Sequence, residues 1–352
     1  MNIHETSFMR ACMRQPVAQT PVWFMRQAGR SLPEYRKIRE RYSFMDISRN
    51  PELCAEVTLQ PVRRLHVDAA ILFADIMTPL IASGVKLELV EHIGPVLDKP
   101  IRTVKDLRQI RPLSPEEQLP YIFDAIRLIK QELGAARPLI GFAGAPFTLA
   151  SYLIEGKGSR AFLHTKRLML AKPTLWHDLM DRLTEMTIRY LQFQIAAGAD
   201  VVQLFDSWVG CLGATDYAEF VQPYSRRIIA AINQTSTPFI HFGVGTSALL
   251  PLMGADGADV IGVDWHQSLD SAWQQIGDHV AIQGNLDPAF LLAPWDILRE
   301  KARAVLDSAH GRPGHIFNLG HGIYPETPVK NLIQLVEFVH AYSMQTSEVL
   351  VS

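Results

Sequence analysis

Cysteine is scarce in this sequence: Cys12, Cys54 and Cys211 are the only ones among 352 residues, and they form no C-x-x-C pair. An odd number of widely spaced cysteines argues against a disulfide framework or a cysteine-based zinc site, and it fits a reducing compartment. The sequence also lacks an apolar run of about 18 residues and an N-terminus with the apolar stretch of a signal peptide. We therefore expect a cytoplasmic protein with no membrane contact.

An excess of positive charge is missing as well. Lysine and arginine total 34 against 36 acidic residues, which gives a formal net charge of −2. Proteins that bind nucleic acid or acidic membranes present a basic surface, so neither partner is expected here. Any anion-binding site in this chain must therefore be local.

Several cofactor and metal motifs are absent. No H-x-x-x-H, H-E-x-x-H or G-x-x-x-x-G-K-[ST] pattern occurs. Residues 155–159 (EGKGS) resemble a phosphate-binding loop only faintly, because the leading glycine is missing. No lysine directly follows a predicted strand, which disfavours a Schiff-base enzyme. These absences argue against a metal site, a nucleotide-binding phosphate loop and a Schiff-base enzyme.

Apolar residues are abundant, at 48%, so the chain can bury a large core. Short β-type runs alternate with longer helical patterns along its length. The predicted strands are Val22–Met25, Asp68–Phe73, Pro138–Phe142, Asp200–Phe205, Pro238–Phe242, Asp259–Val263, Val280–Gln283 and His315–Leu319.

This alternation predicts a single (β/α)8 barrel domain over residues 1–352. An open doubly wound sheet is the alternative, although no G-x-G-x-x-G follows the first strand. Alternating polarity in Val85–Leu89 predicts a small hairpin inserted after the second strand. Ser114 is expected to open a helix as its cap, with Glu117 completing a capping box, and Gly198 is expected to end a long helix that starts near Leu175.

The stretch Pro21–Arg30 (PVWFMRQAGR) places two arginines, Arg26 and Arg30, just after a buried strand. Each guanidinium presents a planar fork of donors that suits carboxylates and phosphates. The small residues Ala28 and Gly29 leave room for a ligand to approach the backbone. The stretch therefore predicts an anion site, unless both arginines are ordinary surface residues.

Other polar residues follow the remaining strands, where a barrel builds its active site. Asp75 lies in an apolar stretch and either faces the cleft or caps the next helix. Ser207 either contacts a ligand or caps a helix, and His321, between two glycines, either belongs to the site or is a structural hydrogen-bonding group. Asp206, Asp264 and Asn285 occupy similar positions.

Longer motifs resemble the uroporphyrinogen decarboxylase family. Residues 21–39 (PVWFMRQAGRSLPEYRKIR) and 141–159 (GFAGAPFTLASYLIEGKGS) are similar to two long signatures of that family. Shorter stretches match it in the same order: FADIMTP (73–79), QLFDSWVG (203–210), QGNLDP (283–288) and FNLGHGIYPETP (317–328). The resemblance covers nearly the whole chain.

The resemblance implies a single (β/α)8 barrel that forms a homodimer and needs no cofactor or metal. The implied reaction removes carbon dioxide from the four acetate side chains of uroporphyrinogen III and gives coproporphyrinogen III. It implies catalytic roles for Asp75, Arg26 and Tyr152. The substrate contacts that it implies are Arg26, Gln27, Ala28, Gly29, Arg30, Asp75, Tyr152, Ser207 and His321.

These residue types suit such a substrate, which carries carboxylates outside and pyrrole N–H groups inside. Arg26, Arg30 and His321 would serve as cations at the rim, and Asp75 would accept the N–H groups at the centre. The proton donor stays open among Arg26, His321 and a relayed water.

Two rival functions remain. A corrinoid-linked methyltransferase of similar barrel fold would hold zinc with a His-x-Cys pair, whereas His241 is followed by Phe242 and Gly243, and no cysteine comes after Cys211. A non-catalytic tetrapyrrole carrier would use the same cleft without releasing carbon dioxide.

Overall fold

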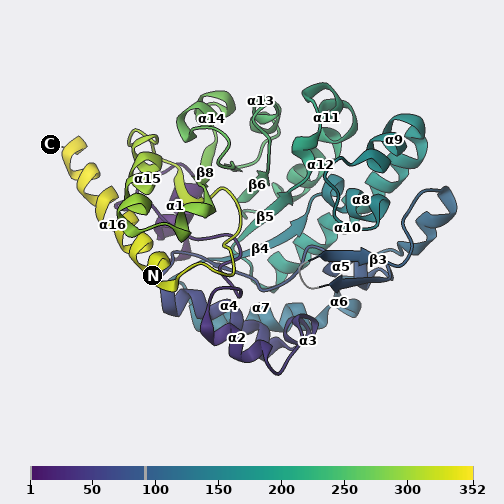
Figure 1. Cartoon of the computed structure of the whole chain (residues 1–352), viewed down its shortest axis with the longest axis horizontal. Coiled ribbons are helices and arrows are strands. Elements are labelled where there is room, and N and C mark those ends of the chain that lie inside the picture. Colours follow the sequence, from purple (N-terminus) through teal and green to yellow (C-terminus); the bar gives the residue numbers. More distant parts are fainter. Residues whose placement is uncertain (1, 91–92, 352) are drawn as a thin grey trace.

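The computed structural model describes residues 2–90 and 93–351. Its centre is a curled sheet of seven parallel strands in the order β1-β4-β5-β6-β7-β8-β9, with helices around it (Figure 1). The strands are β1 (Ala70–Ile71), β4 (Leu139–Gly144), β5 (Val201–Asp206), β6 (Phe239–Gly243), β7 (Val260–Gly262), β8 (Ala281–Leu286) and β9 (His315–Leu319). The predicted α/β class and parallel sheet are confirmed.

The first predicted strand, Val22–Met25, forms an isolated bridge in place of a regular strand. Val22 pairs in parallel with Phe317, and the Trp23 N–H donates to the Phe317 carbonyl at 3.3 Å. On the other side, the Asp68 N–H donates to the Val22 carbonyl at 2.8 Å, and the Val22 N–H donates to the Asp68 carboxylate at 2.7 Å. This segment therefore lies between β9 and the chain that enters β1.

Helices cover the outside of the sheet (Figure 1). The helices between or after the strands are α4 (Pro51–Leu65), α7 (Pro120–Leu133), α10 (Pro173–Ala197), α12 (Gln222–Ile232), α13 (Leu250–Gly254), α14 (Leu269–Ile276), α15 (Trp295–Asp307) and α16 (Val329–Val351). Shorter helices lie at the ends and in the loops: η1 (Ile3–Glu5), α1 (Ser7–Cys12), α2 (Pro33–Arg39), α3 (Phe44–Arg49), α5 (Thr78–Ala82), η2 (Val104–Gln109), α6 (Pro115–Gln118), α8 (Pro146–Glu155), α9 (Leu163–Ala171), η3 (Val209–Cys211), α11 (Ala214–Phe220) and η4 (Pro288–Leu292). Within the described ranges, no helix has the length and apolar character to cross a bilayer.

The helix predicted from Ser114 is split in two, which corrects the sequence prediction. Pro120 has no N–H to donate to the preceding turn, so α6 ends at Gln118 and α7 starts with Pro120 in its first turn. The expected capping box at Glu117 is wrong, because the Ser114 N–H donates to the Gln118 side chain at 2.8 Å. The predicted end of the long helix is confirmed: α10 stops before Gly198, whose φ is 120°.

A two-stranded antiparallel sheet lies between β1 and β4 in the chain. It pairs β2 (Leu87–Val90) with β3 (Gly94–Leu97). Residues 91–92 of the connecting segment lie outside the described ranges. The predicted alternation in Val85–Leu89 thus overlaps β2.

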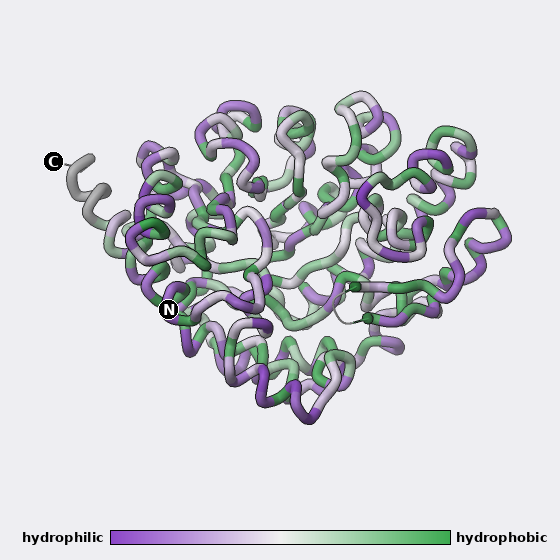
Figure 2. Tube along the Cα trace, viewed as in Figure 1, coloured by the Kyte–Doolittle hydropathy of each residue, from purple (hydrophilic) through white to green (hydrophobic). Residues whose placement is uncertain are grey.

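The interior of the curled sheet is mainly apolar and contains a short chain of polar side chains. Hydrophobic residues concentrate along the central strands (Figure 2). In the polar chain, the Trp23 indole N–H donates to the Gln283 side chain at 2.9 Å, and the Gln283 amide donates to the Gln203 side chain at 3.1 Å. All three side chains are buried, so this chain ties the N-terminal segment to β8 and β5.

Candidate active site

The predicted site residues come from segments that leave the carboxyl ends of different strands. Asp75 follows β1, Tyr152 lies on α8 after β4, Ser207 follows β5, and His321 follows β9. Parallel strands bring all these ends to one edge of a sheet, which is where barrels and open α/β folds bind ligands. Arg26 reaches the same edge from the segment beside β9.

The loop from Arg26 to Arg30 has a constrained backbone. The φ angles of Arg26 and Arg30 are 62° and 39°, a left-handed conformation that few residues other than glycine adopt. The buried Gln27 side chain holds the loop from inside: it accepts from the Phe24 N–H at 2.9 Å and donates to the Ala69 carbonyl at 2.9 Å. The side chain of Gln27 therefore supports the loop, and a ligand can reach this residue only through its backbone.

The next two residues of the loop, Ala28 and Gly29, are small, so the backbone can lie close to neighbouring side chains. The φ of Gly29 is 104°, and a Cβ added to it would lie 3.4 Å from the Tyr35 ring and 3.5 Å from the Phe73 ring. Ala28 is half-buried beside it. The loop thus passes closely over a pair of aromatic rings whose centroids are 5.7 Å apart.

The Arg26 side chain lies against Gly322, one residue beyond His321. A Cβ added to Gly322 would lie 2.7 Å from Arg26 Cγ and 3.0 Å from its Nε. The glycine is therefore required for the observed path of the arginine. This contact explains in physical terms why glycine follows the histidine in the sequence.

Asp75, Arg26 and Tyr152 act on one another electrostatically. Burial raises the pKa of Asp75, and a hydrogen bond from the Met77 N–H at 2.8 Å together with the Arg26 charge opposes that rise. Burial of the charged group lowers the pKa of Arg26, which Asp75 opposes, although the residue as a whole is exposed. Asp75 is not the N-cap of α5, because that position belongs to Met77. The structure thus brings the three predicted catalytic residues together.

Trp208 is a member of this group that the sequence analysis did not identify. Its side chain hydrogen-bonds the Tyr152 hydroxyl, which moderates the rise in the pKa of Tyr152 caused by burial. The two rings also meet edge to face at 5.8 Å, and Phe162 packs on the indole at 5.5 Å. An aromatic residue directly after Ser207 was the available signal, since an indole N–H in a cleft needs an acceptor.

His321 is a neutral group in this structure. Burial, Arg26 and Arg30 lower its pKa to about 4, and Asp264 opposes the shift. The Trp265 ring meets it at 90° with the centroids 6.3 Å apart. The expectation of a third rim cation is therefore modified: the two arginines supply positive charge, and His321 supplies a neutral hydrogen-bonding group.

Ser207 is half-buried in the turn after β5. It caps no helix, because the next element, η3, has Trp208 at its N-cap position. The hydroxyl therefore remains available at the same edge as Tyr152 and Asp75.

The other polar residues at the strand ends serve the backbone and the loops. Asp206 accepts from the Thr148 hydroxyl at 2.9 Å, which joins β5 to α8. Asp264 accepts from the Gly245 N–H, and the Asn285 amide donates to the Asp264 carbonyl at 2.8 Å. These bonds fix the neighbouring loops in place.

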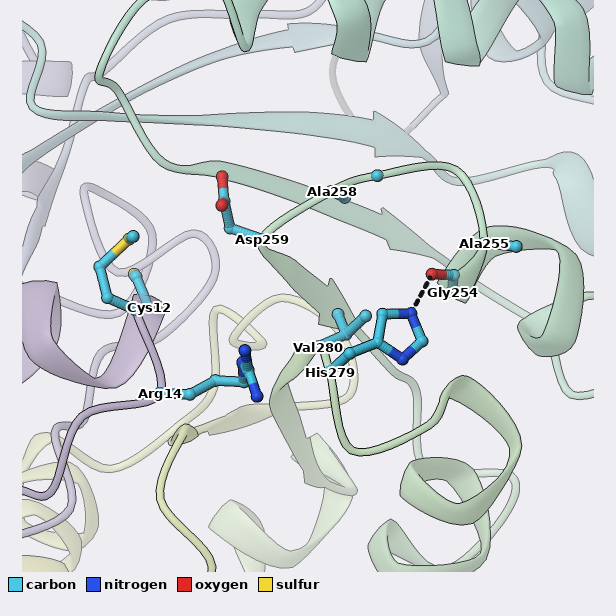
Figure 3. A pocket seen from close by; sticks show the side chains of 10 residues that line it. Cys12, Arg14, Gly254, Ala255, Ala258, Asp259, His279 and Val280 are labelled. Atoms are coloured by element: carbon cyan, nitrogen blue, oxygen red, sulfur yellow. Dashed lines mark hydrogen bonds between the residues drawn. The ribbon is translucent and has the colours of Figure 1, made fainter.

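The opposite end of the sheet contains a cavity of about 360 Å³ that includes none of the predicted residues. Cys12, Arg14, Asp259 and His279 line it, and the His279 ring lies 3.2 Å from the Gly254 carbonyl (Figure 3). Asp259 precedes β7, so this cavity lies at the amino ends of the strands, where barrel residues usually contribute stability. Among residues 2–90 and 93–351, no group of three His, Cys, Asp or Glu side chains is arranged to hold a metal ion.

The arrangement at the carboxyl edge can bind an anion and stabilise a cation side by side. Arg26 and Arg30 offer donors for carboxylates. Asp75 offers acceptor oxygens to N–H groups and a negative charge to an electron-deficient centre. Tyr152 keeps its proton at neutral pH, because its pKa is raised, and therefore adds one donor.

Comparison with known proteins shows to which family the chain is related. A family model described as uroporphyrinogen decarboxylase (URO-D) matches residues 4–342. The chain belongs to this family. A uroporphyrinogen decarboxylase from Carboxydothermus hydrogenoformans is 51% identical over 344 residues, which is 98% of this chain and 98% of that relative. Another from Streptomyces avermitilis is 55% identical and spans 96% of this chain and 94% of the relative.

More distant solved structures share the architecture of this URO-D family member. A methyltransferase from Methanosarcina mazei has a TM-score of 0.81 at 21% identity, covering 96% of this chain and 98% of the other. A B12-independent methionine synthase from Shewanella sp. W3-18-1 has a TM-score of 0.58 at 12% identity, covering 97% and 99%. At such identities the likeness concerns the fold alone. It explains why the methyltransferase alternative could arise from a barrel pattern.

Proposed function

We propose that this chain removes carbon dioxide from the four acetate side chains of uroporphyrinogen III and releases coproporphyrinogen III. The observation that supports this most is the electrostatic interaction of the buried Asp75 with Arg26 and Tyr152 in a member of the URO-D family. A carboxylate beside a guanidinium suits a substrate with N–H groups at its centre and carboxylates around it.

The central step in this proposal is protonation of a pyrrole carbon. Loss of carbon dioxide directly from an acetate would leave a poorly stabilised carbanion, whereas a protonated pyrrole accepts the electron pair. Protonation places positive charge on the ring beside Asp75, and the electron pair released with carbon dioxide neutralises it as an exocyclic methylene. A second proton added to that methylene and loss of the first proton from the ring then give the methyl group. A fixed carboxylate aimed at developing charge can contribute roughly 3 kcal/mol, by analogy with a single oxyanion-hole donor.

The rim residues bind the substrate in this proposal. Arg26 and Arg30 would pair with its carboxylates, and Ser207 and His321 would donate hydrogen bonds to them. Because His321 is neutral in the free protein, a carboxylate that approaches it would favour its protonated form. A proton held there by the bound substrate is one source for the pyrrole carbon, and Arg26 or a relayed water is the other.

The finer features of the fold belong to the same proposal. The Val22 segment would act as an eighth strand and close the barrel, which its bonds to Phe317 and Asp68 support. The chain would form one domain over residues 1–352, with β2 and β3 as an inserted hairpin, and would work in the cytoplasm as a homodimer without metal or cofactor. Identity of 51% with a relative over 98% of both chains supports a shared architecture.

Anaerobic turnover tests the proposal. Wild-type protein should convert an eight-carboxylate porphyrinogen to the four-carboxylate product, and Asp75→Asn should not. A non-catalytic carrier would bind the porphyrinogen and leave its carboxylates intact, so it predicts no product with either protein. Turnover by Asp75→Asn near the wild-type rate would contradict the central role of the carboxylate.

Thermal unfolding supplies an independent control on the same variant. Because burial raises the pKa of Asp75, the ionised carboxylate costs stability in the folded protein at pH above that pKa. Asp75→Asn removes this cost, so the variant should unfold at a higher temperature than wild type at pH 7.5. The difference should shrink as the pH falls through the raised pKa. An inactive variant that is also more stable cannot have lost activity by unfolding.

A further inference from the structure

Arg36 lies on α2, outside the group of residues described above, and its guanidinium contacts two separate loops. Its Nε donates to the Arg30 carbonyl at 3.4 Å, and its Nη2 donates to the Ser31 carbonyl at 3.2 Å. The same Nη2 donates to the Pro325 carbonyl at 3.1 Å, across 289 positions of sequence. One guanidinium therefore joins the arginine loop to the loop that carries His321.

These two loops both require support. Arg30 has a positive φ, which the surrounding structure must stabilise. On the inner side, the Ile323 N–H donates to the Met25 carbonyl at 3.0 Å and holds the loops together near the sheet. Arg36 is the corresponding contact on the solvent side, and its planar fork allows three carbonyls to be held at once.

Charged side chains lie close to the contact that Arg36 makes between the two loops. Glu326, next to Pro325, acts electrostatically on Arg30, and Arg30 acts on His321. Moving one loop away from the other would therefore change the electrostatic environment of all three groups.

We propose that Arg36 is a positioning residue that fixes the spacing between Arg30 and His321 and thereby sets the affinity for a substrate with several carboxylates. This inference rests on the proposed function. It assigns Arg36 no contact with the reacting atoms. Its loss should weaken binding and leave the chemical step nearly intact.

Arg36→Met is the variant to test, because it keeps an apolar stem and removes every donor. Arg39→Met is the matched control: Arg39 lies on the same helix and also donates to a carbonyl, that of Tyr42 three positions away in its own segment, at 2.8 Å. Of the three bonds that are lost, the one to the Pro325 carbonyl joins the two loops, and loss of one hydrogen bond from a charged donor should raise KM about tenfold or more. We expect that rise for Arg36→Met with kcat within about twofold of wild type, and no change in either constant for Arg39→Met.

Two further measurements do not depend on turnover. NMR titration of the His321 ring should show a pKa higher than the wild-type value of about 4 in Arg36→Met, because Arg30 is no longer held close to it, while burial and Arg26 still keep the pKa below 6.5. Amide hydrogen exchange should accelerate in residues 26–31 and 320–328 and remain unchanged elsewhere. If wild type showed no decarboxylation, the proposed function would fail, and these two measurements would still decide whether Arg36 joins the loops.

Arg36→Lys covers the case in which the methionine variant does not fold. A lysine keeps the charge and can reach one loop, but it lacks the fork that joins both, so its KM should also rise. The inference is overturned if the folded variant, Met or Lys, has the KM, the His321 titration and the exchange pattern of wild type. It is also overturned if kcat falls and KM does not change.

Discussion

Replacing His321 by asparagine should change how the stability of the protein depends on pH. The pKa of His321 falls from an ordinary 6.5 to about 4 on folding, which corresponds to about 3 kcal/mol, because one pKa unit is about 1.4 kcal/mol. As the pH falls below 6.5, the unfolded chain binds a proton at this position and the folded protein does not. Wild type therefore loses stability between pH 6.5 and 4, and the loss attributable to His321 is complete below about pH 4.

Denaturant unfolding of both proteins from pH 7.5 to 4 measures this effect. The free energy of unfolding of wild type should fall by about 3 kcal/mol more than that of His321→Asn over this interval. His315, whose pKa is also lowered to about 4 by burial, is present in both proteins, so its contribution cancels. Parallel stability curves, or an NMR titration of His321 near pH 6.5, would refute the assignment of a neutral His321 held down by burial and two arginines.

The same shift has a consequence for binding. A carboxylate placed beside His321 would raise its pKa, so the complex should take up a proton near neutral pH. Calorimetry in buffers of different ionisation enthalpy measures this uptake directly. His321→Asn should abolish it and leave binding through Arg26 and Arg30.

Gly322→Ala should displace Arg26, because the added Cβ would lie 2.7 Å from the arginine Cγ; we expect KM to rise about tenfold. Gly158→Ala, where a Cβ meets no atom within 4 Å, should leave the kinetics unchanged, and a similar loss in both variants would rule out the specific contact. Trp208→Phe should lower kcat by removing the hydrogen bond to Tyr152. The double variant with Tyr152→Phe should then be no worse than Tyr152→Phe alone, whereas additive losses would show that the two side chains act separately.

Strand positions could be predicted wherever a short apolar run lies between polar or glycine residues. His315–Leu319 is predicted and observed with the same bounds. Asp68–Phe73 is observed only as Ala70–Ile71. At one end the Asp68 carboxylate accepts the Val22 N–H, and at the other the Phe73 N–H donates to the Thr58 hydroxyl at 3.0 Å, so side chains take the place of backbone partners. The bond between Val22 and Asp68 joins residues 46 positions apart, so a local sequence pattern cannot predict that a side chain replaces a backbone partner there.

The location of the site was predictable for a related reason. Residues just past parallel strands share one edge of the sheet, so Asp75, Ser207 and His321 could be grouped without coordinates. Their electrostatic states could not, because the low pKa of His321 depends on its burial in the folded protein and on two arginines almost 300 positions earlier in the chain. The sequence also did not indicate that the buried Gln27 side chain holds the arginine loop in place, because a glutamine beside an arginine is typical of a surface residue.

The bridge between Val22 and Phe317 has a consequence for the order of events during folding. These residues are separated by most of the chain, and contacts of such sequence separation form slowly because a long loop must close first. The Met25 N–H likewise has its partner on β9, because it donates to the Asn318 side chain at 3.1 Å. During synthesis on a ribosome, Arg26 and Arg30 can therefore take up their positions in the site only after nearly the whole polypeptide has emerged. Nascent chains that stop short of β9 should therefore be unable to bind ligand, however well their first helices have formed.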